Sequence, residues 1–173
     1  MRLLLQTMIE IPITFEMIEQ ARQQAAEMGA LRNSIREGEG NLVGFIGEQV
    51  AQKVLGGFID NTYDHDLMMD DFLTTVDVKT KETTVAPKPH YDCSVAAYNT
   101  KQKCDYYCFI RVKNDLSVGW YLGVYPKNKY FEDARKLNKG DLDPDNNFTV
   151  KADCYNLTID KLSCGMNARI FNK

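Results

Sequence analysis

Acidic residues and lysines are concentrated between residues 63 and 81, and their spacing favours a shared surface. Residues 72–81 are rich in threonine and valine, which is typical of a β-strand. Alternate residues of a strand point to the same face, so Asp77 and Lys79 share one face while Val78 points to the other. A carboxylate and an ammonium group are therefore expected side by side.

Asp64 and Asp66 also share a face if residues 63–69 form the preceding strand of a hairpin. A two-residue turn would place Asp64 opposite Asp77, with Asp66 as the diagonal neighbour, whereas a four-residue loop at 70–73 would place Asp66 directly opposite. Either register brings at least two carboxylates within about 4.5–8 Å of each other. Unpaired carboxylates repel at this distance, and a hard divalent cation with oxygen ligands removes that conflict.

Glu48 adds a further carboxylate from an otherwise apolar helix predicted over residues 42–55. Gly44, Gly47 and Ala51 surround it on one side, and such small residues let a sheet or a ligand approach the helix closely. Each of these acids, taken singly, is more often a solvated surface residue. Their joint occurrence favours a site.

The surrounding elements predict an α/β protein with a mixed central β-sheet flanked by helices. An amphipathic helix is expected over residues 15–28 with Thr14 as its cap, and Asn41 is expected to cap the second helix. We expect one domain over residues 1–173, with an N-terminal strand and helix extension at 1–40 and a core at 41–173. Later segments predict further strands and one helix: strands at 93–98, 106–112, 118–125 and 148–159, and a helix at 128–137.

Composition excludes several function classes. The 173 residues carry a net charge of −3, so a nucleic-acid surface would have to be local. Five cysteines without a Cys-x-x-Cys pair argue against zinc and redox sites, and there is no glycine-rich phosphate loop. Glu10 and Pro12 interrupt the apolar start of the chain, so we expect a cytoplasmic protein without a membrane span.

Glu48, Asp66 and the tripeptide Asp77-Val78-Lys79 follow an order and spacing that resembles the PD-(D/E)XK nucleases. That family has a restriction-endonuclease-like fold, with a Glu on an early helix, an Asp at the start of one strand and an acid-x-Lys on the next. The resemblance covers roughly residues 41–112. Asp77 takes the place more often held by Glu, and Asp64 competes with Asp66 for the upstream position.

The resemblance implies metal-dependent hydrolysis of phosphodiester bonds in nucleic acid, with a DNA endonuclease as the expected activity. Asp66 and Asp77 would hold Mg²⁺, for which Mn²⁺ can substitute, with help from the Val78 carbonyl and Glu48. Lys79 would orient or deprotonate the attacking water and stabilise developing charge. A cation that acts as a Lewis acid and lowers the pKa of water suits this reaction.

Lys81, Lys101 and Lys103 follow the motif and could contact substrate phosphates as point charges. Gln102 joins them because similar nucleases often have a Gln near the site after the motif. The expected substrate path contains these four residues together with Lys88 and His90, and Tyr91 and Tyr98 are interleaved with them.

The alternative is a catalytically inactive binding protein with the same fold, encoded by a phage and directed at a host factor or a nucleic acid. Residues 44–57, followed by 63–67 and 76–81, resemble nuclease-like phage proteins, which would place the protein in the host cytoplasm. The sequence leaves open whether the protein is a homodimer, and whether its substrate is DNA or RNA, duplex, branched or single-stranded.

Overall fold

A six-stranded mixed sheet forms the centre of this α/β protein, as the sequence predicts. The computed structural model describes residues 8–31, 39–143 and 147–166. The elements are β1 (Ile9–Pro12), α1 (Phe15–Leu31), α2 (Glu39–Leu55), β2 (Phe58–Ile59), β3 (Leu67–Met68), β4 (Thr75–Thr83), β5 (Asp92–Ala96), β6 (Tyr106–Lys113), β7 (Val118–Pro126), α3 (Lys127–Asp133), β8 (Arg135–Leu137) and β9 (Cys154–Thr158).

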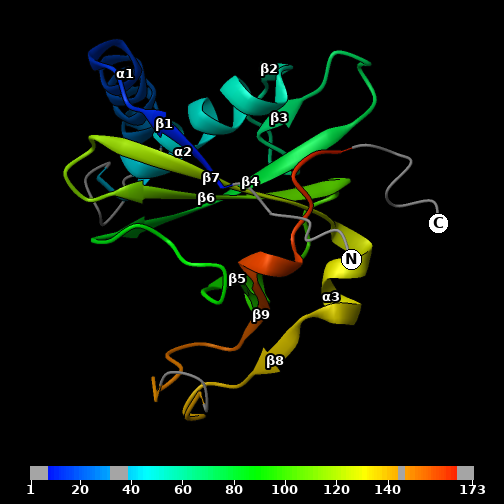
Figure 1. Cartoon of the computed structure of the whole chain (residues 1–173). Helices are drawn as coiled ribbons and strands as arrows, with labels where there is room; N and C mark the ends of the chain where they lie inside the picture. Colours follow the sequence, from blue (N-terminus) through cyan, green and yellow to red (C-terminus); the bar gives the residue numbers. More distant parts are fainter. Residues whose placement is uncertain (1–7, 32–38, 144–146, 167–173) are drawn as a thin grey trace, which may run out of the picture.

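The strand order is β1-β7-β6-β4-β3-β2, and a second sheet of three strands has the order β5-β9-β8. Figure 1 shows α1 and α2 on one side of the large sheet and the small sheet on the other.

The two long helices form where the sequence predicts them. Thr14 caps α1, since its hydroxyl accepts a hydrogen bond of 3.2 Å from the Met17 amide. The second helix ends at Leu55 as expected, and Gly56 follows in the left-handed region with φ of 78°. Its expected start was wrong: α2 begins at Glu39, so Asn41 lies inside the helix and does not cap it. Most of the loop expected before it, residues 32–38, lies outside the described residues.

The predicted hairpin exists, but its first strand is much shorter than expected. β3 comprises only Leu67–Met68 and pairs antiparallel with β4. The preceding residues form a turn instead, in which the Thr62 hydroxyl accepts hydrogen bonds from the Asp64 and His65 amides. The loop between the strands is the four-residue one, because the Met69 amide bonds the Thr74 carbonyl.

β4 separates two cores because its side chains alternate between its faces. Val76 and Val78 pack into the core that contains α1 and α2. On the other face, Asp77 pairs in register with Tyr107 and Lys79 with Phe109 in the parallel neighbour β6. Tyr107 and Phe109 belong to the core under the small sheet. Asp77 and Lys79 therefore share one face of β4, as their spacing predicts, and this face is turned toward the small sheet.

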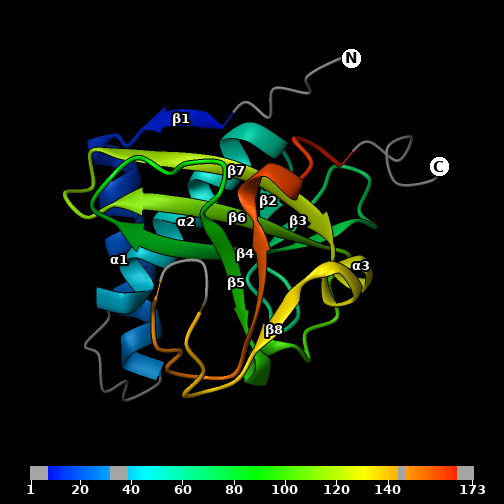
Figure 2. The same ribbon diagram turned by 60° about the horizontal axis from the view of Figure 1, so that its bottom comes forward.

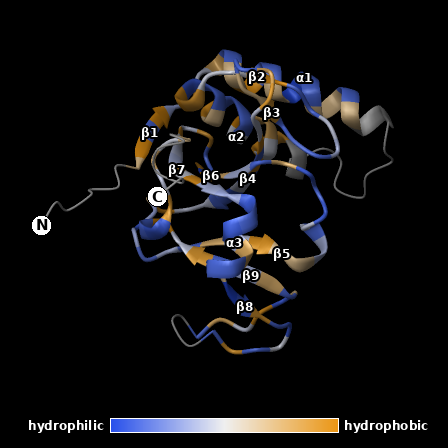
Figure 3. Cartoon of the chain, turned by 90° about the vertical axis from the view of Figure 1, so that its right-hand side faces the viewer, coloured by the Kyte–Doolittle hydropathy of each residue, from blue (hydrophilic) through white to orange (hydrophobic). Residues whose placement is uncertain are grey.

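The C-terminal half departs from the expected elements in two places. The late helix ends at Asp133, and Arg135–Leu137 forms β8 instead, paired antiparallel with β9. The final strand covers Cys154–Thr158 only. In Figure 2 the small sheet comes forward beneath the large one. Figure 3 shows α3 mostly in the hydrophilic colour, in front of more apolar strands of the small sheet. The sequence did not reveal β2, whose two residues give no periodic signal.

Gly47 lets α2 approach β4 closely. A Cβ at this position would lie 1.9 Å from Thr80 Oγ1 and 2.7 Å from Thr80 Cγ2. Overpacking of this kind typically costs about 1–3 kcal/mol, so Gly47→Ala should lower the free energy of unfolding by that amount or more. Chemical denaturation measures the change.

Gly44 supplies the matched control, since a Cβ there would meet nothing within 4 Å. Gly44→Ala should stabilise α2 by about 0.5–1 kcal/mol through its helix propensity. Adding Thr80→Ala should recover part of the stability that Gly47→Ala loses. Equal stabilities for Gly44→Ala and Gly47→Ala would contradict the close approach of α2 to β4.

Candidate functional site

Three carboxyl side chains meet where β3 joins β4 under α2. Continuing the β3–β4 register places Asp66 directly opposite Asp77, as the four-residue loop predicted. Asp66 Oδ2 accepts a hydrogen bond of 2.7 Å from the Val78 amide, which fixes this carboxyl at the strand edge. Glu48 approaches Asp66 from α2, and Asp66 in turn is close enough to Asp77 for a hydrogen bond between the side chains.

Burial and mutual repulsion raise the pKa of two of these carboxyls. Burial, followed by the charge of Asp66, raises the pKa of Glu48 from 4.5 to about 8. Burial, followed by the charge of Asp77, raises the pKa of Asp66 from 3.8 to about 7. The protein alone therefore disfavours three ionised carboxylates at this position.

Lys79 is held beside the acids by an ion pair. Its Nζ lies 2.6 Å from Asp77 Oδ2, and the two side chains are 16% and 10% exposed. The ammonium also lies 5.5 Å from the ring centroid of Tyr107, a distance at which the ring face attracts a cation. Asp77 and Lys79 thus form one pre-positioned unit that is mostly shielded from water.

The donor set fits a hard divalent cation. All three candidate side chains offer oxygen, the ligand type that Mg²⁺ prefers. Glu48 Oε2 is buried and has no hydrogen-bond partner among the described residues, and such a group lacks compensation for its lost hydration. As the side chains stand, no group of three or more His, Cys, Asp or Glu in the described ranges is already placed to hold a metal ion. Cation binding would therefore require a small rearrangement of these side chains.

The structure separates Asp64 from this cluster. Asp64 Oδ1 accepts a hydrogen bond of 2.9 Å from the Lys103 amide, so it anchors a loop. Asp66 and not Asp64 is the upstream acid near Asp77. The anchored loop carries the predicted substrate residues Lys101, Gln102 and Lys103 to the neighbourhood of β3.

The predicted substrate residues differ in their surroundings. Lys101 and Lys103 are exposed. Gln102 is half-buried, its carbonyl accepts a hydrogen bond from the Lys127 ammonium, and its Oε1 is buried without a partner among the described residues. Lys81 continues the face of β4 that carries Asp77 and Lys79, but it lines a separate cavity.

Sequence reasoning missed three neighbours of the acids. The Asn61 side chain lies close enough to Glu48 to lower the pKa of its carboxyl, and Cys104 lies near Asp77. Tyr107 supplies the ring beneath Lys79. Tyr107 lies beside Asp77 because β6 pairs parallel with β4. The two strands are far apart in the sequence, and no local sequence pattern predicts that they pair.

The cysteines are free thiols, in agreement with the sequence. Burial raises the pKa of both Cys93 and Cys104 to about 12. A thiol with so high a pKa carries almost no thiolate near neutral pH and is a poor nucleophile.

Comparisons with known proteins return no family: no protein-family model matches the chain, and a search of the curated proteins finds no match. Within the described ranges, no helix combines the length and the apolar character that crossing a membrane requires.

Proposed function

We propose that the protein is a metal-dependent nuclease that hydrolyses phosphodiester bonds in nucleic acid, with DNA as the expected substrate. The observation that carries the proposal is the meeting of Glu48, Asp66 and Asp77 beside Lys79, in an otherwise buried part of the sheet. The resemblance of these residues to the PD-(D/E)XK pattern supports the same reaction.

Asp66, Asp77 and Glu48, with the Val78 carbonyl, would hold Mg²⁺. The bound cation would supply Lewis-acid stabilisation of charge on the phosphoryl group and lower the pKa of water. The Val78 amide fixes one oxygen of Asp66, so the other oxygen can serve as a ligand. Cation binding also compensates the repulsion that raises the pKa of Asp66 and Glu48.

Lys79 has two roles in this proposal. In the absence of a cation, its ammonium neutralises Asp77 at 2.6 Å. When Asp77 serves as a ligand, the ammonium is released from this pair, and its N–H donors can contact a phosphate oxygen or orient the attacking water. Phosphoryl transfer depends mainly on such positioning and charge stabilisation.

A cleavage assay tests the proposal. Labelled duplex, branched and single-stranded DNA, together with RNA, are incubated with Mg²⁺, Mn²⁺ or excess EDTA. We expect cleavage of at least one substrate with either metal and none in EDTA. Cleavage that persists in EDTA would rule out the metal mechanism. Binding without cleavage under every condition would instead support the inactive binding protein.

Lys101 and Lys103 should contribute phosphate contacts, because they are exposed on the loop anchored by Asp64. Replacing both with Ala should weaken nucleic-acid binding and reduce the slope of log K against log salt by about two at most. Fluorescence anisotropy at several salt concentrations measures this slope.

The matched control replaces two other exposed lysines, Lys139 and Lys161, with Ala. Neither of them belongs to the expected substrate path. The control should retain the parental slope. Equal slopes for the parent and the Lys101/Lys103 variant would show that these residues do not contact nucleic acid.

The homodimer and the cytoplasmic location stay predictions.

A further inference from the structure

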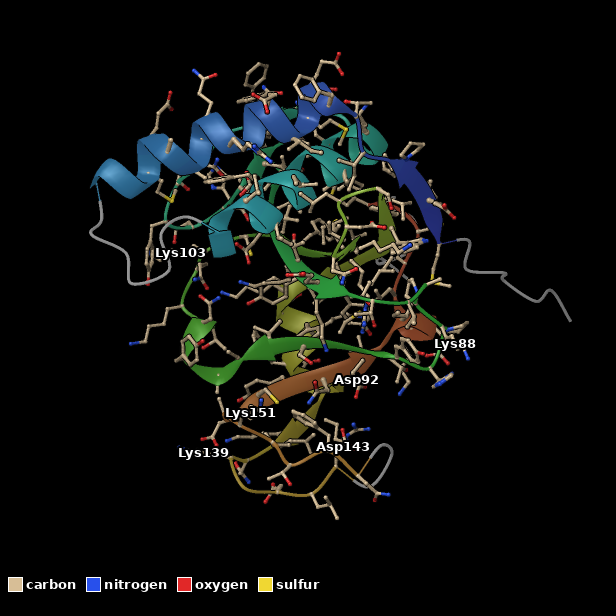
Figure 4. All side chains as sticks on the ribbon, turned by 90° about the vertical axis from the view of Figure 1, so that its left-hand side faces the viewer. Lys88, Asp92, Lys103, Lys139, Asp143 and Lys151 are labelled. Atoms are coloured by element: carbon tan, nitrogen blue, oxygen red, sulfur yellow. The ribbon has the colours of Figure 1, made fainter. Side chains whose placement is uncertain are left out.

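A cavity of about 620 Å³ lies between the acid-bearing face of β4 and the small sheet. This volume is within the range of small-molecule sites, which is roughly 300–1,000 Å³. Its lining combines cations with aromatic and apolar side chains, including Lys81, Tyr91, Arg111, Phe148, Val150 and Lys151. Figure 4 shows Lys151 beside the small sheet, with Asp92 and Asp143 nearby.

Among the described residues that line the cavity, Lys81, Arg111 and Lys151 outnumber the acids Asp92 and Asp143, in a protein whose net charge is negative. Lys81 and Arg111 are register partners in β4 and β6, so they emerge side by side on one face. No carboxylate of the described residues lies within ion-pair distance of either. The cavity also contains Asp92 and Asp143, but both of these acids form ion pairs with Arg135.

Arg111 lines the cavity, and two contacts hold its guanidinium in place. Only 7% of the residue is exposed, and its Nη2 donates a hydrogen bond of 2.9 Å to the Asp92 carbonyl. Its guanidinium lies 5.3 Å from the ring centroid of Tyr91. The guanidinium carries further N–H donors in a planar fork that matches phosphate.

The positive charge of Lys81 is disfavoured at its position beside the buried Arg111. Partial burial, followed by the charge of Arg111, lowers its pKa. A bound anion would offset both the burial of Lys81 and its repulsion by Arg111, because it would interact with the ammonium in place of water and would attract both positive charges.

Aromatic and apolar groups complete the lining. Lys151 lies 5.9 Å from the ring centroid of Phe148, and Val150 and Leu137 supply apolar wall. Cations together with aromatic rings are the combination that binds the phosphate and the planar base of a nucleotide.

The same strand, β4, contributes residues to the cavity and to the candidate active site. Lys79 and Lys81 are alternate residues of one strand, about 7 Å apart along it. A smaller cavity of about 60 Å³ is lined by both lysines and by Arg111. One strand of a duplex carries a charge about every 3.4 Å of axis, so the larger cavity begins one to two nucleotides from Lys79.

We propose that this cavity binds a nucleoside monophosphate group, with Arg111 and Lys81 on the phosphate and with Tyr91 or Phe148 against the base. The group can be a free nucleotide or the phosphorylated end of a nucleic-acid strand. The second source rests on the proposed nuclease function, whereas the first does not.

Isothermal titration calorimetry in EDTA tests binding without cleavage. We expect AMP or dCMP to bind saturably, and adenosine to bind at least about tenfold more weakly. Lys81→Gln should weaken nucleotide binding by about tenfold, and so should Arg111→Lys, which retains the charge and loses the planar fork. Lys139→Gln is the control, since Lys139 is exposed outside the lining, and it should bind as the parent does. Lys81 is exposed, so Lys81→Gln does not alter the packing of a core and should fold as the parent does.

Three results would overturn the proposal: no saturable binding at millimolar nucleotide, equal binding of adenosine and AMP, or unchanged binding by Lys81→Gln. Competition then separates the sources. An oligonucleotide with a terminal phosphate, but not its unphosphorylated form, should displace a fluorescent nucleotide if the strand end is the occupant. Absence of displacement supports a free nucleotide. Nucleotide binding in EDTA together with a failed cleavage assay would refute the nuclease and retain the nucleotide site.

Discussion

Asp77→Asn should reduce metal-dependent cleavage by at least about a hundredfold. The substitution keeps the size of the side chain but removes the charge that faces both Asp66 and Lys79. Loss of one pre-positioned electrostatic group commonly costs a factor of 10²–10³ in rate. Cleavage of a labelled substrate with Mg²⁺ or Mn²⁺ measures the effect.

The same variant should lose its stabilisation by metal. A ligand at a hundredfold excess over its dissociation constant adds about 2.7 kcal/mol, which shifts the melting temperature of a protein of this size by about 5–10 °C. Millimolar Mn²⁺ should produce such a shift in the parent and much less in Asp77→Asn.

Asp64→Asn provides the control for this experiment. Asp64 lies two residues from Asp66, yet its carboxylate accepts a hydrogen bond from the Lys103 amide, a contact that Asn can retain. The variant should keep both cleavage and the metal-induced shift. Parental cleavage by Asp77→Asn would refute the catalytic assignment, and loss of the metal shift in Asp64→Asn would refute the choice of Asp66.

The metal-free protein should become less stable as pH rises from about 5 to about 8. In the folded protein Glu48 and Asp66 keep their protons up to about pH 8 and 7, whereas their ordinary pKa values are 4.5 and 3.8. The unfolded chain releases these protons first, so rising pH lowers the free energy of the unfolded state relative to that of the folded state. Each carboxyl contributes a slope of up to about 1.4 kcal/mol per pH unit.

Glu48→Gln should flatten this pH dependence, because Gln resembles the protonated acid and does not titrate. Urea denaturation in EDTA at several pH values measures the slope. Glu132→Gln removes a negative charge from an exposed position and should leave the parental profile unchanged. Millimolar Mn²⁺ should oppose the trend, because metal binding requires the ionised carboxylates. An equally steep profile for Glu48→Gln would show that this carboxyl does not control stability.

Local patterns predicted the parts of the site that depend on neighbouring residues. The two-residue period placed Asp77 and Lys79 on one face of β4, and small residues around Glu48 indicated the close approach that Gly47 makes to Thr80. Periodicity identifies a face, but it does not identify the element that covers it. The partner of that face, Tyr107, depends on a parallel pairing that only the folded chain defines.

The errors have a similar origin. Residues 63–66 are predicted as part of a strand, but the Thr62 hydroxyl accepts hydrogen bonds from the Asp64 and His65 amides, and β3 begins only at Leu67. Arg135–Leu137 continues a helical pattern, but pairing with β9 offers its backbone an alternative set of hydrogen bonds. Tertiary pairing overrides local propensity where an element is only two or three residues long.

The pairing of β1 with β7 imposes an order on folding during synthesis. Ile9 pairs with Tyr121, and Pro12 with Val118, so β1 is translated long before the strand with which it pairs. At about 5–20 residues per second, the ribosome needs on the order of 5–20 s to deliver β7 after β1. The β3–β4 hairpin and α2 are complete well before then. β1 remains unpaired throughout this interval, and an unpaired strand can associate with a strand of another chain.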